Sequence, residues 1–206
     1  DVSHCNEGHA AFLGLERIRN LVLRRRLTFA EALEVVRSSS LFTTHTPVPA
    51  GHDAFPEAMV RQYLSHYPGE LGIDWAQFIG LGRVDPEDPN EKFSMSVLAC
   101  NLSQEVNGVS WLHGEVSKEI LGNLWPGYFK NELHIGYVTN GVHFPTWTAM
   151  RLRRLYARYF PEGFEGHEYR ISEWKKVYDI PDEDLWRERL VLKEKIVSMI
   201  RRRYCD

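Results

Sequence analysis

The segment Ser40–Gly51, with sequence SLFTTHTPVPAG, holds the residues best placed to do chemistry. A short apolar run precedes His45, and two prolines and a glycine follow it. Such a run predicts a buried strand, and the Pro/Gly cluster predicts a loop at its carboxyl end. Ligands of open α/β sheets lie outside the carboxyl ends of strands. His45 is therefore a candidate site residue beside the hydroxyls of Thr43, Thr44 and Thr46, and the alternative is a structural histidine.

Two other segments have the same kind of composition. The segment HCNEGH, residues 4–9, opens a helical pattern, and GYVTNGVH, residues 136–143, is a strand-like run that ends in Asn-Gly. Together with the first segment they supply groups that could hydrogen-bond sugar hydroxyls. These groups belong to Asn6, Glu7, His9, His45, Thr46 and Asn140. Alternatives stay open, because residues 6–7 could cap a helix and residues 140–141 could form a tight turn.

Composition bounds the class of protein. The chain has 206 residues, enough for one large domain or two partial ones, with 43% hydrophobic and 26% charged residues. A net charge of -3 gives no electrostatic reason to expect nucleic acid or an anionic membrane as a partner. No apolar run approaches the roughly 20 residues that span a bilayer. No signal peptide is visible, and Cys5, Cys100 and Cys205 are odd in number and far apart. We expect reduced thiols and a cytoplasmic location.

Periodicity and breakers predict a helix-rich α/β chain. We expect two or three short strands, including one before His45 and one over residues 135–139, against about eight helices. Thr28 and Glu31 predict a capping box, and Asn107-Gly108 predicts a turn. The expected helices, nine when each short one is counted, cover residues 7–26, 28–37, 55–67, 74–79, 94–104, 114–123, 145–160, 171–178 and 181–204. So few strands suggest an excerpt from a larger α/β protein.

The sequence lacks the motifs that are typical of metal sites, nucleotide sites and serine hydrolases. The histidine pairs 4/9 and 45/52 do not match His-Glu-x-x-His, and no Cys-x-x-Cys occurs, so we expect no metal site. No Gly-x-Gly-x-x-Gly or Gly-Lys-Ser/Thr loop supports a nucleotide site. No Gly-x-Ser-x-Gly elbow supports a serine hydrolase.

Four segments, in order, resemble the α-glucan (glycogen, starch and maltodextrin) phosphorylases. They span most of residues 1–150, and four ordered motifs are far more specific than one. Their sequences are NEGHAAF at 6–12, TTHTPVPAG at 43–51, VNGVSWLHGE at 106–115 and VTNGVH at 138–143. The second segment is more similar to the shorter bacterial and archaeal enzymes than to the animal ones.

The resemblance implies a fold and a reaction. The family has two Rossmann-like domains, a GT-B-like architecture, with the active site between them. Its members transfer a terminal α-1,4-linked glucosyl unit to inorganic phosphate and give glucose 1-phosphate with retained configuration. Pyridoxal 5′-phosphate relays a proton through its own phosphate. In this chain, residues 1–140 would be the last part of the N-terminal, glucan-side domain, and residues 141–206 the opening helices of the second, cofactor-side domain.

The resemblance also implies roles for individual residues. His45 matches the catalytic histidine, which hydrogen-bonds the glucosyl unit and helps to stabilise an oxocarbenium-like transition state. Asn140 matches an asparagine that holds a hydroxyl of the same ring. Thr46, Asn6 and His9 match residues beside the pocket and are candidate substrate-binding residues. Asn107 and His113 match a segment expected to give structural support.

One departure from the family pattern concerns the cofactor. The family's pyridoxal-binding lysine, and the Arg and Lys that hold the substrate phosphate, have no match in the chain. The regulatory sites of this allosteric family also lie in regions outside it. The resemblance therefore predicts half of a sugar site, no cofactor site and no catalysis by the 206 residues alone.

Other readings and partners follow from that incompleteness. The expected partners are an α-1,4-glucan, phosphate and the remainder of the enzyme, and surface meant for that remainder would favour self-association into a homo-oligomer. Two alternatives remain at this point. One is a non-catalytic glucan-binding or interaction module, and the other is a helical scaffold in which every motif is structural.

Overall fold

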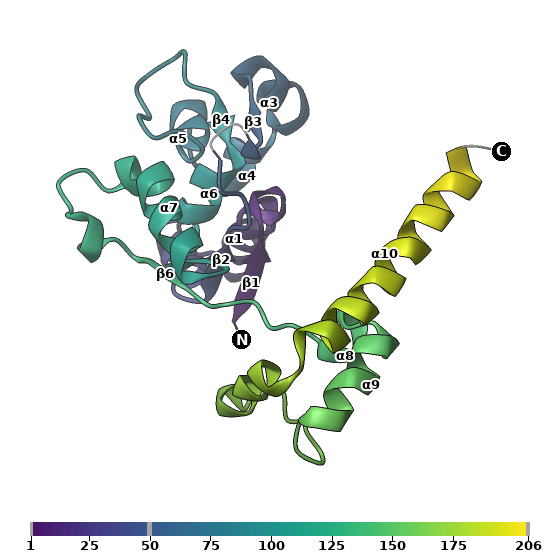
Figure 1. Ribbon diagram of the computed structural model, residues 1–206. Coiled ribbons are helices and arrows are strands. Elements are labelled where there is room, and N and C mark those ends of the chain that lie inside the picture. The colour runs from purple at the N-terminus through teal and green to yellow at the C-terminus, as the bar shows by residue number, and fades with distance from the viewer. Residues whose placement is uncertain (1, 49–50, 205–206) are drawn as a thin grey trace. The chain divides into compact units, whose positions relative to one another are not determined.

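The computed structural model describes residues 2–48 and 51–204, so Pro49 and Ala50 of the His45 loop and Cys205 lie outside the described residues (Figure 1). The chain divides into two compact units, one of residues up to Asn140 and one from Gly141 onward. That these units belong to separate phosphorylase domains stays a prediction.

The first unit is built on a parallel sheet. Its strands are β1 (Ser3–Asn6), β2 (Ser40–Thr43), β5 (Glu105–Gly108) and β6 (Ile135–Tyr137), in the order β1-β2-β5-β6. In the register of the sheet, Asn6 of β1 lies opposite Thr43 of β2, and Thr43 lies opposite Asn107 of β5. Gly108 of β5 lies opposite Tyr137 of β6. All four strands therefore end at one edge. The expected α/β, helix-rich class is confirmed.

Helices connect and cover these strands. Helix α2 (Phe29–Arg37) starts with the predicted capping box, in which Thr28 and Glu31 bond each other's backbone N–H. Helix α7 (Trp111–Leu121) packs against β5 and β6. The other helical segments of this unit are η1 (Gly8–Ala10), α1 (Phe12–Arg25), α3 (Glu57–Leu64), α4 (Tyr67–Leu71), α5 (Trp75–Gly80), α6 (Met95–Asn101), η3 (Gly122–Leu124) and η4 (Lys130–Glu132).

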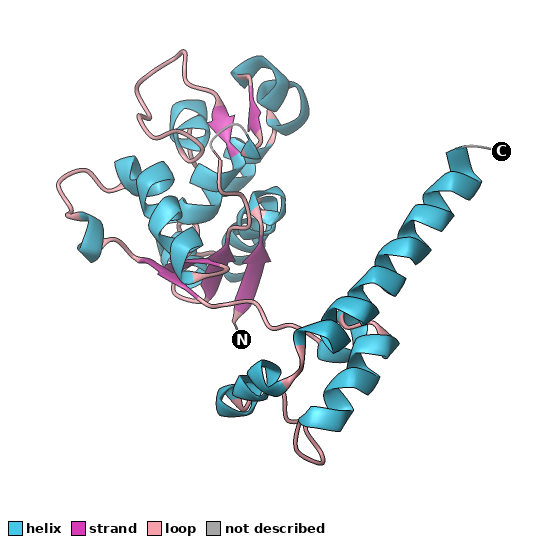
Figure 2. Cartoon of the chain, in the orientation of Figure 1, coloured by secondary structure: helices cyan, strands magenta, loops and turns pink. Residues whose placement is uncertain are grey.

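A small antiparallel ribbon lies apart from the parallel sheet. Its strands are β3 (Ala54–Phe55) and β4 (Phe93–Ser94), the two short arrows in Figure 2. Phe93 of β4 and Phe78 of α5 are both fully buried, with ring centroids 6.2 Å apart. They belong to one core with buried residues of α1, β2 and α6, including Leu15, Phe42 and Leu98.

Several expected boundaries are wrong. Residues 3–6 form strand β1, and α1 begins at Phe12 rather than at residue 7. Asn107-Gly108 is the end of strand β5, not a turn. The described part of the chain contains six strands rather than two or three. Both missed strands of the large sheet are four residues long and polar, and pairing with β2 decides their conformation.

Two expected helices are interrupted. The helix predicted over 55–67 ends at Leu64, and Pro68 lies in the first turn of α4 instead of ending a helix. Proline is tolerated there because first-turn N–H groups have no helical partner. Gly72, with φ 73°, ends α4. The helix predicted over 145–160 is likewise divided into two.

In the second unit, all the regular secondary structure of the described residues is helical. It consists of α8 (Phe144–Trp147), α9 (Met150–Tyr159), η5 (Ile171–Asp179) and the long α10 (Asp182–Tyr204). Its core is aromatic, with Trp174 edge-on to Phe144, Phe160 and Phe164 at 5.1–5.9 Å between ring centroids. Among the described residues, no helix is both long and apolar enough to cross a membrane.

Replacing Arg26 by glycine is expected to raise the free energy of unfolding by about 1 kcal/mol, because a left-handed backbone costs a residue with a Cβ about that much. Arg26 follows α1 with φ 58° and ψ 30° and is exposed. The measurement is urea unfolding of the 206-residue chain. Arg25→Gly, within the helix, is the matched control and should destabilise; a loss of stability in both variants would contradict the argument.

Candidate functional site

The imidazole of His45 lies exposed just beyond the carboxyl end of β2. Its Nε2 is 2.7 Å from Oδ1 of Asn6, the last residue of β1. The register of β1 and β2 pairs Asn6 with Thr43, which brings the residues after both strands together. The structure thus places two predicted site residues in direct contact.

The carboxylate of Glu7 joins both strand ends. Its Oε2 accepts hydrogen bonds from the His45 amide at 2.8 Å and from the Thr46 hydroxyl at 3.1 Å. Its Oε1 accepts from the Gly8 amide at 2.9 Å. The backbone N–H of Glu7 in turn donates to the carbonyl of Thr43 at 2.8 Å. One residue therefore holds the start of η1 and the loop that carries His45.

The environment of Glu7 favours its charged form. Burial acts to raise the pKa of this carboxyl, but the amides of Gly8 and His45, the Thr46 hydroxyl and the nearby His52 outweigh it and lower the pKa. The carboxylate accepts three hydrogen bonds, and an ionised carboxylate is a stronger acceptor than a protonated one.

Acidification is therefore expected to weaken the fold at this edge. A carboxyl whose pKa is lowered on folding stabilises the protein above its unfolded pKa, near 4.5, and this contribution is lost as pH falls through the folded pKa. Urea midpoints measured at roughly pH 7 and roughly pH 3 should fall more for the wild type than for Glu7→Gln. Equal falls in the two proteins would contradict the expectation.

A ladder of polar side chains crosses the sheet one step below the edge. Nε2 of His4 lies 2.7 Å from Oγ1 of Thr43, and that hydroxyl lies 3.1 Å from Oδ1 of Asn107. Asn107 is buried, and its backbone carbonyl accepts a hydrogen bond from the backbone N–H of Thr44 at 3.0 Å. These bonds tie β1, β2 and β5 together beneath the candidate site.

His113 fixes the loop after β5. It is buried on α7, and its Nδ1 accepts from the Val109 amide at 3.1 Å. A Cβ at Gly108 would come within 2.7 Å of the Gly114 backbone nitrogen, so only glycine permits this approach of α7 to β5. Asn107 and His113 are both buried, and their hydrogen bonds hold β2 and the loop after β5 in place.

The remaining predicted residues, Asn140 and His9, also follow the carboxyl ends of strands of this sheet. Asn140 is exposed after β6, and its backbone N–H donates to the Val109 carbonyl at 3.1 Å. His9 is exposed in η1, which follows β1. Among the described residues, no hydrogen bond joins the side chains of Asn140 or His9 to His45.

Two further residues lie at this edge. The sequence offered Glu7 only as a possible hydrogen-bonding group or helix cap, and His52 was not among the candidate site residues. His52 is half-buried, with Nδ1 2.5 Å from Oγ of Ser96, and burial lowers its pKa although Glu7 opposes that shift. Glu7 stands inside the NEGH segment, so the segment itself was the available signal. His52 has no comparable local signal, because its neighbours come from a helix more than forty residues away.

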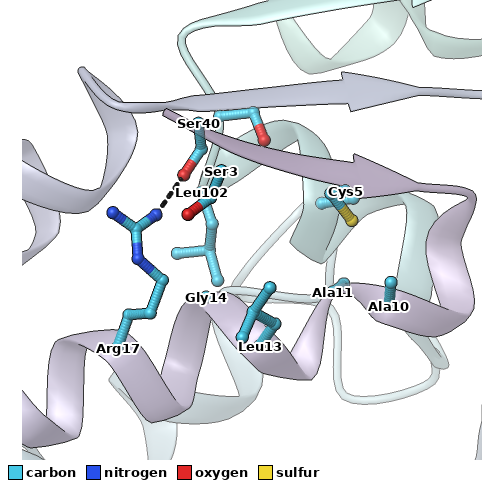
Figure 3. A pocket seen from close by; sticks show the side chains of 11 residues that line it. Ser3, Cys5, Ala10, Ala11, Leu13, Gly14, Arg17, Ser40 and Leu102 are labelled. Carbon is cyan, nitrogen blue, oxygen red and sulfur yellow. Dashed lines mark hydrogen bonds between the residues drawn. The ribbon is translucent and has the colours of Figure 1, made fainter. Parts of the chain in front are cut away.

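The cavity between α1 and the amino ends of β1 and β2 is not part of this site. Figure 3 shows its lining, where Arg17 donates to the Ser40 hydroxyl at 2.8 Å. Its volume of about 20 Å³ is that of a single water molecule, far too small for a sugar. Cys5 also lines this cavity. Burial, the larger cause, and the charge of Glu7, the smaller, raise the pKa of its thiol to about 11. Cys5 and Cys100 are free thiols.

Comparison with known proteins supplies the relatives of the chain. No family model matches it. It is 41% identical over 216 residues to a glycogen phosphorylase of Mycobacterium tuberculosis, covering 98% of this chain and 24% of that protein. It is 40% identical over 202 residues to a maltodextrin phosphorylase of Thermococcus litoralis, covering 98% of this chain and 23% of that protein. A glycogen phosphorylase of Aquifex aeolicus is 41% identical, with 97% and 28% covered.

These relatives agree with the family that the four motifs resemble. The chain spans about a quarter of the length of the curated relatives it matches. The match extends over nearly all of its residues, including both compact units. In sequence, the chain therefore corresponds to a fragment of an α-glucan phosphorylase.

Proposed function

We propose that the chain supplies the sugar-binding side of the phosphorylase reaction, within a protein of GT-B-like architecture. The reaction moves a terminal α-1,4-linked glucosyl unit to inorganic phosphate and releases glucose 1-phosphate. The observation that carries the proposal is the joining of His45, Asn6 and Glu7 at the carboxyl edge of a parallel sheet, where α/β proteins bind ligands.

The hydrogen bonds of His45 suit it to a sugar hydroxyl. A carbonyl oxygen can only accept, so in the contact with Asn6 the His45 Nε2 carries the proton. In neutral imidazole Nδ1 is then a lone-pair acceptor, available to a glucosyl hydroxyl. A fixed lone pair beside the ring also favours the positive charge that develops as the glycosidic bond breaks. Asn140, exposed on the same edge, would hold a second hydroxyl of that ring.

The residues at this edge do not fit the cofactor of the family. Pyridoxal phosphate is held through a lysine, and none of the residues at the four strand ends is a lysine. Lys118 and Lys130 are paired with carboxylates of α7, Glu115 and Glu119. The cofactor and the substrate phosphate would therefore be held by the rest of the full-length protein.

The test uses the natural full-length protein. Incubated with maltodextrin and inorganic phosphate, it should release glucose 1-phosphate, and release should stop when phosphate is left out. No product from a folded, pyridoxal-loaded protein would overturn the proposed reaction.

The 206-residue chain by itself is expected to release no glucose 1-phosphate, because it carries only the sugar side of the site. The same assay with the purified chain checks this, with the full-length protein as the positive control. Phosphate-dependent product from the chain alone would overturn the division of the site between this segment and the rest.

A further inference from the structure

We propose that Glu7 is a positioning residue for His45: its carboxylate holds the His45–Thr46 backbone against β1 and so fixes where the imidazole meets the substrate. The inference rests on the proposed function for its kinetic meaning. Its structural content, that Glu7 determines the place of the His45 ring, can be tested without that function.

The backbone of Glu7 is the first observation. Its φ of 74° and ψ of 158° lie in a region that is populated almost only by glycine. Among the described residues, the other non-glycine with positive φ is Arg26, which is in the ordinary left-handed conformation that ends a helix. A strained conformation persists where the surrounding contacts over-determine it, and such residues cluster at functional sites.

The contacts of Glu7 show what the strained backbone achieves. A simple cap of η1 needs one carboxylate oxygen, and Oε1 fills that role with the Gly8 amide. Oε2 is left to reach across to β2, where it accepts from both His45 and Thr46. Capping of η1 therefore does not account for the two hydrogen bonds that the Glu7 carboxylate accepts from His45 and Thr46.

The turn around Glu7 is held from the other side as well. A Cβ placed on Gly8 would lie 3.0 Å from Oγ of Ser96, so the start of α6 packs tightly beneath the turn. Asn6, next to Glu7, meets the far end of the same imidazole at Nε2. Residues 6 and 7 thus hold His45 at its ring and at its backbone, which leaves the Nδ1 position well defined.

The test compares Glu7→Ala with Glu7→Gly in the full-length protein. Alanine removes the carboxylate and keeps the strain, whereas glycine removes both. We expect Glu7→Gly to unfold at a higher temperature than Glu7→Ala, while kcat falls about 10²-fold in both, the loss typical of a misplaced catalytic group. Arg26→Gly is the matched control for glycine at positive φ and should keep wild-type kcat.

The two readings of Glu7 differ in these data. If Glu7 only stabilised the fold, kcat would follow stability and recover in Glu7→Gly. That result would overturn the proposal, and it remains measurable if Glu7→Ala does not fold, because Glu7→Gly is then compared with the wild type.

Crystal structures of the wild-type and Glu7→Gly proteins give a readout independent of turnover. We expect the His45 ring to leave Asn6 in the variant and to stay in Arg26→Gly. An unmoved ring overturns the inference whatever the activity. A wild type that releases no glucose 1-phosphate overturns the proposed function, and the position of the ring still decides the inference.

Discussion

Replacement of His45 by alanine is expected to lower phosphate-dependent release of glucose 1-phosphate by the full-length protein about 10²- to 10³-fold, the range found when one preorganised polar contact to a transition state is removed. His45 is exposed, so the substitution leaves no cavity in the core. The fold should survive and the loss should appear in kcat. The measurement is initial rate against maltodextrin concentration at saturating phosphate.

The matched control is His134→Ala. His134 stands just before β6, at the amino end of the same sheet, and is also exposed. It should keep the rate of the wild type. Full activity in His45→Ala would leave the family assignment in place and remove His45 from the mechanism.

Replacement of Phe78 by alanine is expected to lower the free energy of unfolding of the first unit by about 3–5 kcal/mol, through lost burial and the cavity left behind. Phe78 is 0% exposed and meets Phe93, Trp75 and Tyr67 at 5.5–6.3 Å between ring centroids. Urea unfolding of the 206-residue chain, followed by tryptophan fluorescence, reports the change because Trp75 is a direct neighbour.

Phe129→Ala provides the control for Phe78. Phe129 is 75% exposed, and its hydrogen bonds with Glu132 use its backbone N–H and carbonyl, so they survive the substitution. We expect a change within about 0.5 kcal/mol, as is usual for surface substitutions. Similar losses in both variants would mean that Phe78 is not part of the cooperative core.

Local sequence predicts the elements whose stabilising contacts are themselves local. The capping box predicted at Thr28 and Glu31 involves residues three apart, and it is confirmed. The strand before His45 has an apolar pair and a proline-rich end, which identify it without its partners. Strands β1 and β5, with sequences SHCN and EVNG, carry no such pattern, since pairing with neighbours distant in sequence creates them.

In the candidate site, too, local sequence predicts some features, and contacts between segments distant in sequence determine the others. The residue types and order of the motifs were sufficient to select His45, Asn6, Thr46, His9 and Asn140 as candidates. The register of β1 on β2 is what brings Asn6 to His45, and no residue pattern contains a register. The positive φ of Glu7 is also invisible in sequence, because a glutamate predicts the opposite conformation.

The order of the strands also determines when the His45 edge can form during synthesis. Strands β1 and β2 pair across fewer than forty residues, but β2 must wait for β5, which follows the β3–β4 ribbon and helices α3 to α6. Until residue 108 has left the ribosome, β2 is an open parallel edge able to pair with another nascent chain. The helices between the two strands have mostly local contacts and can form during that interval.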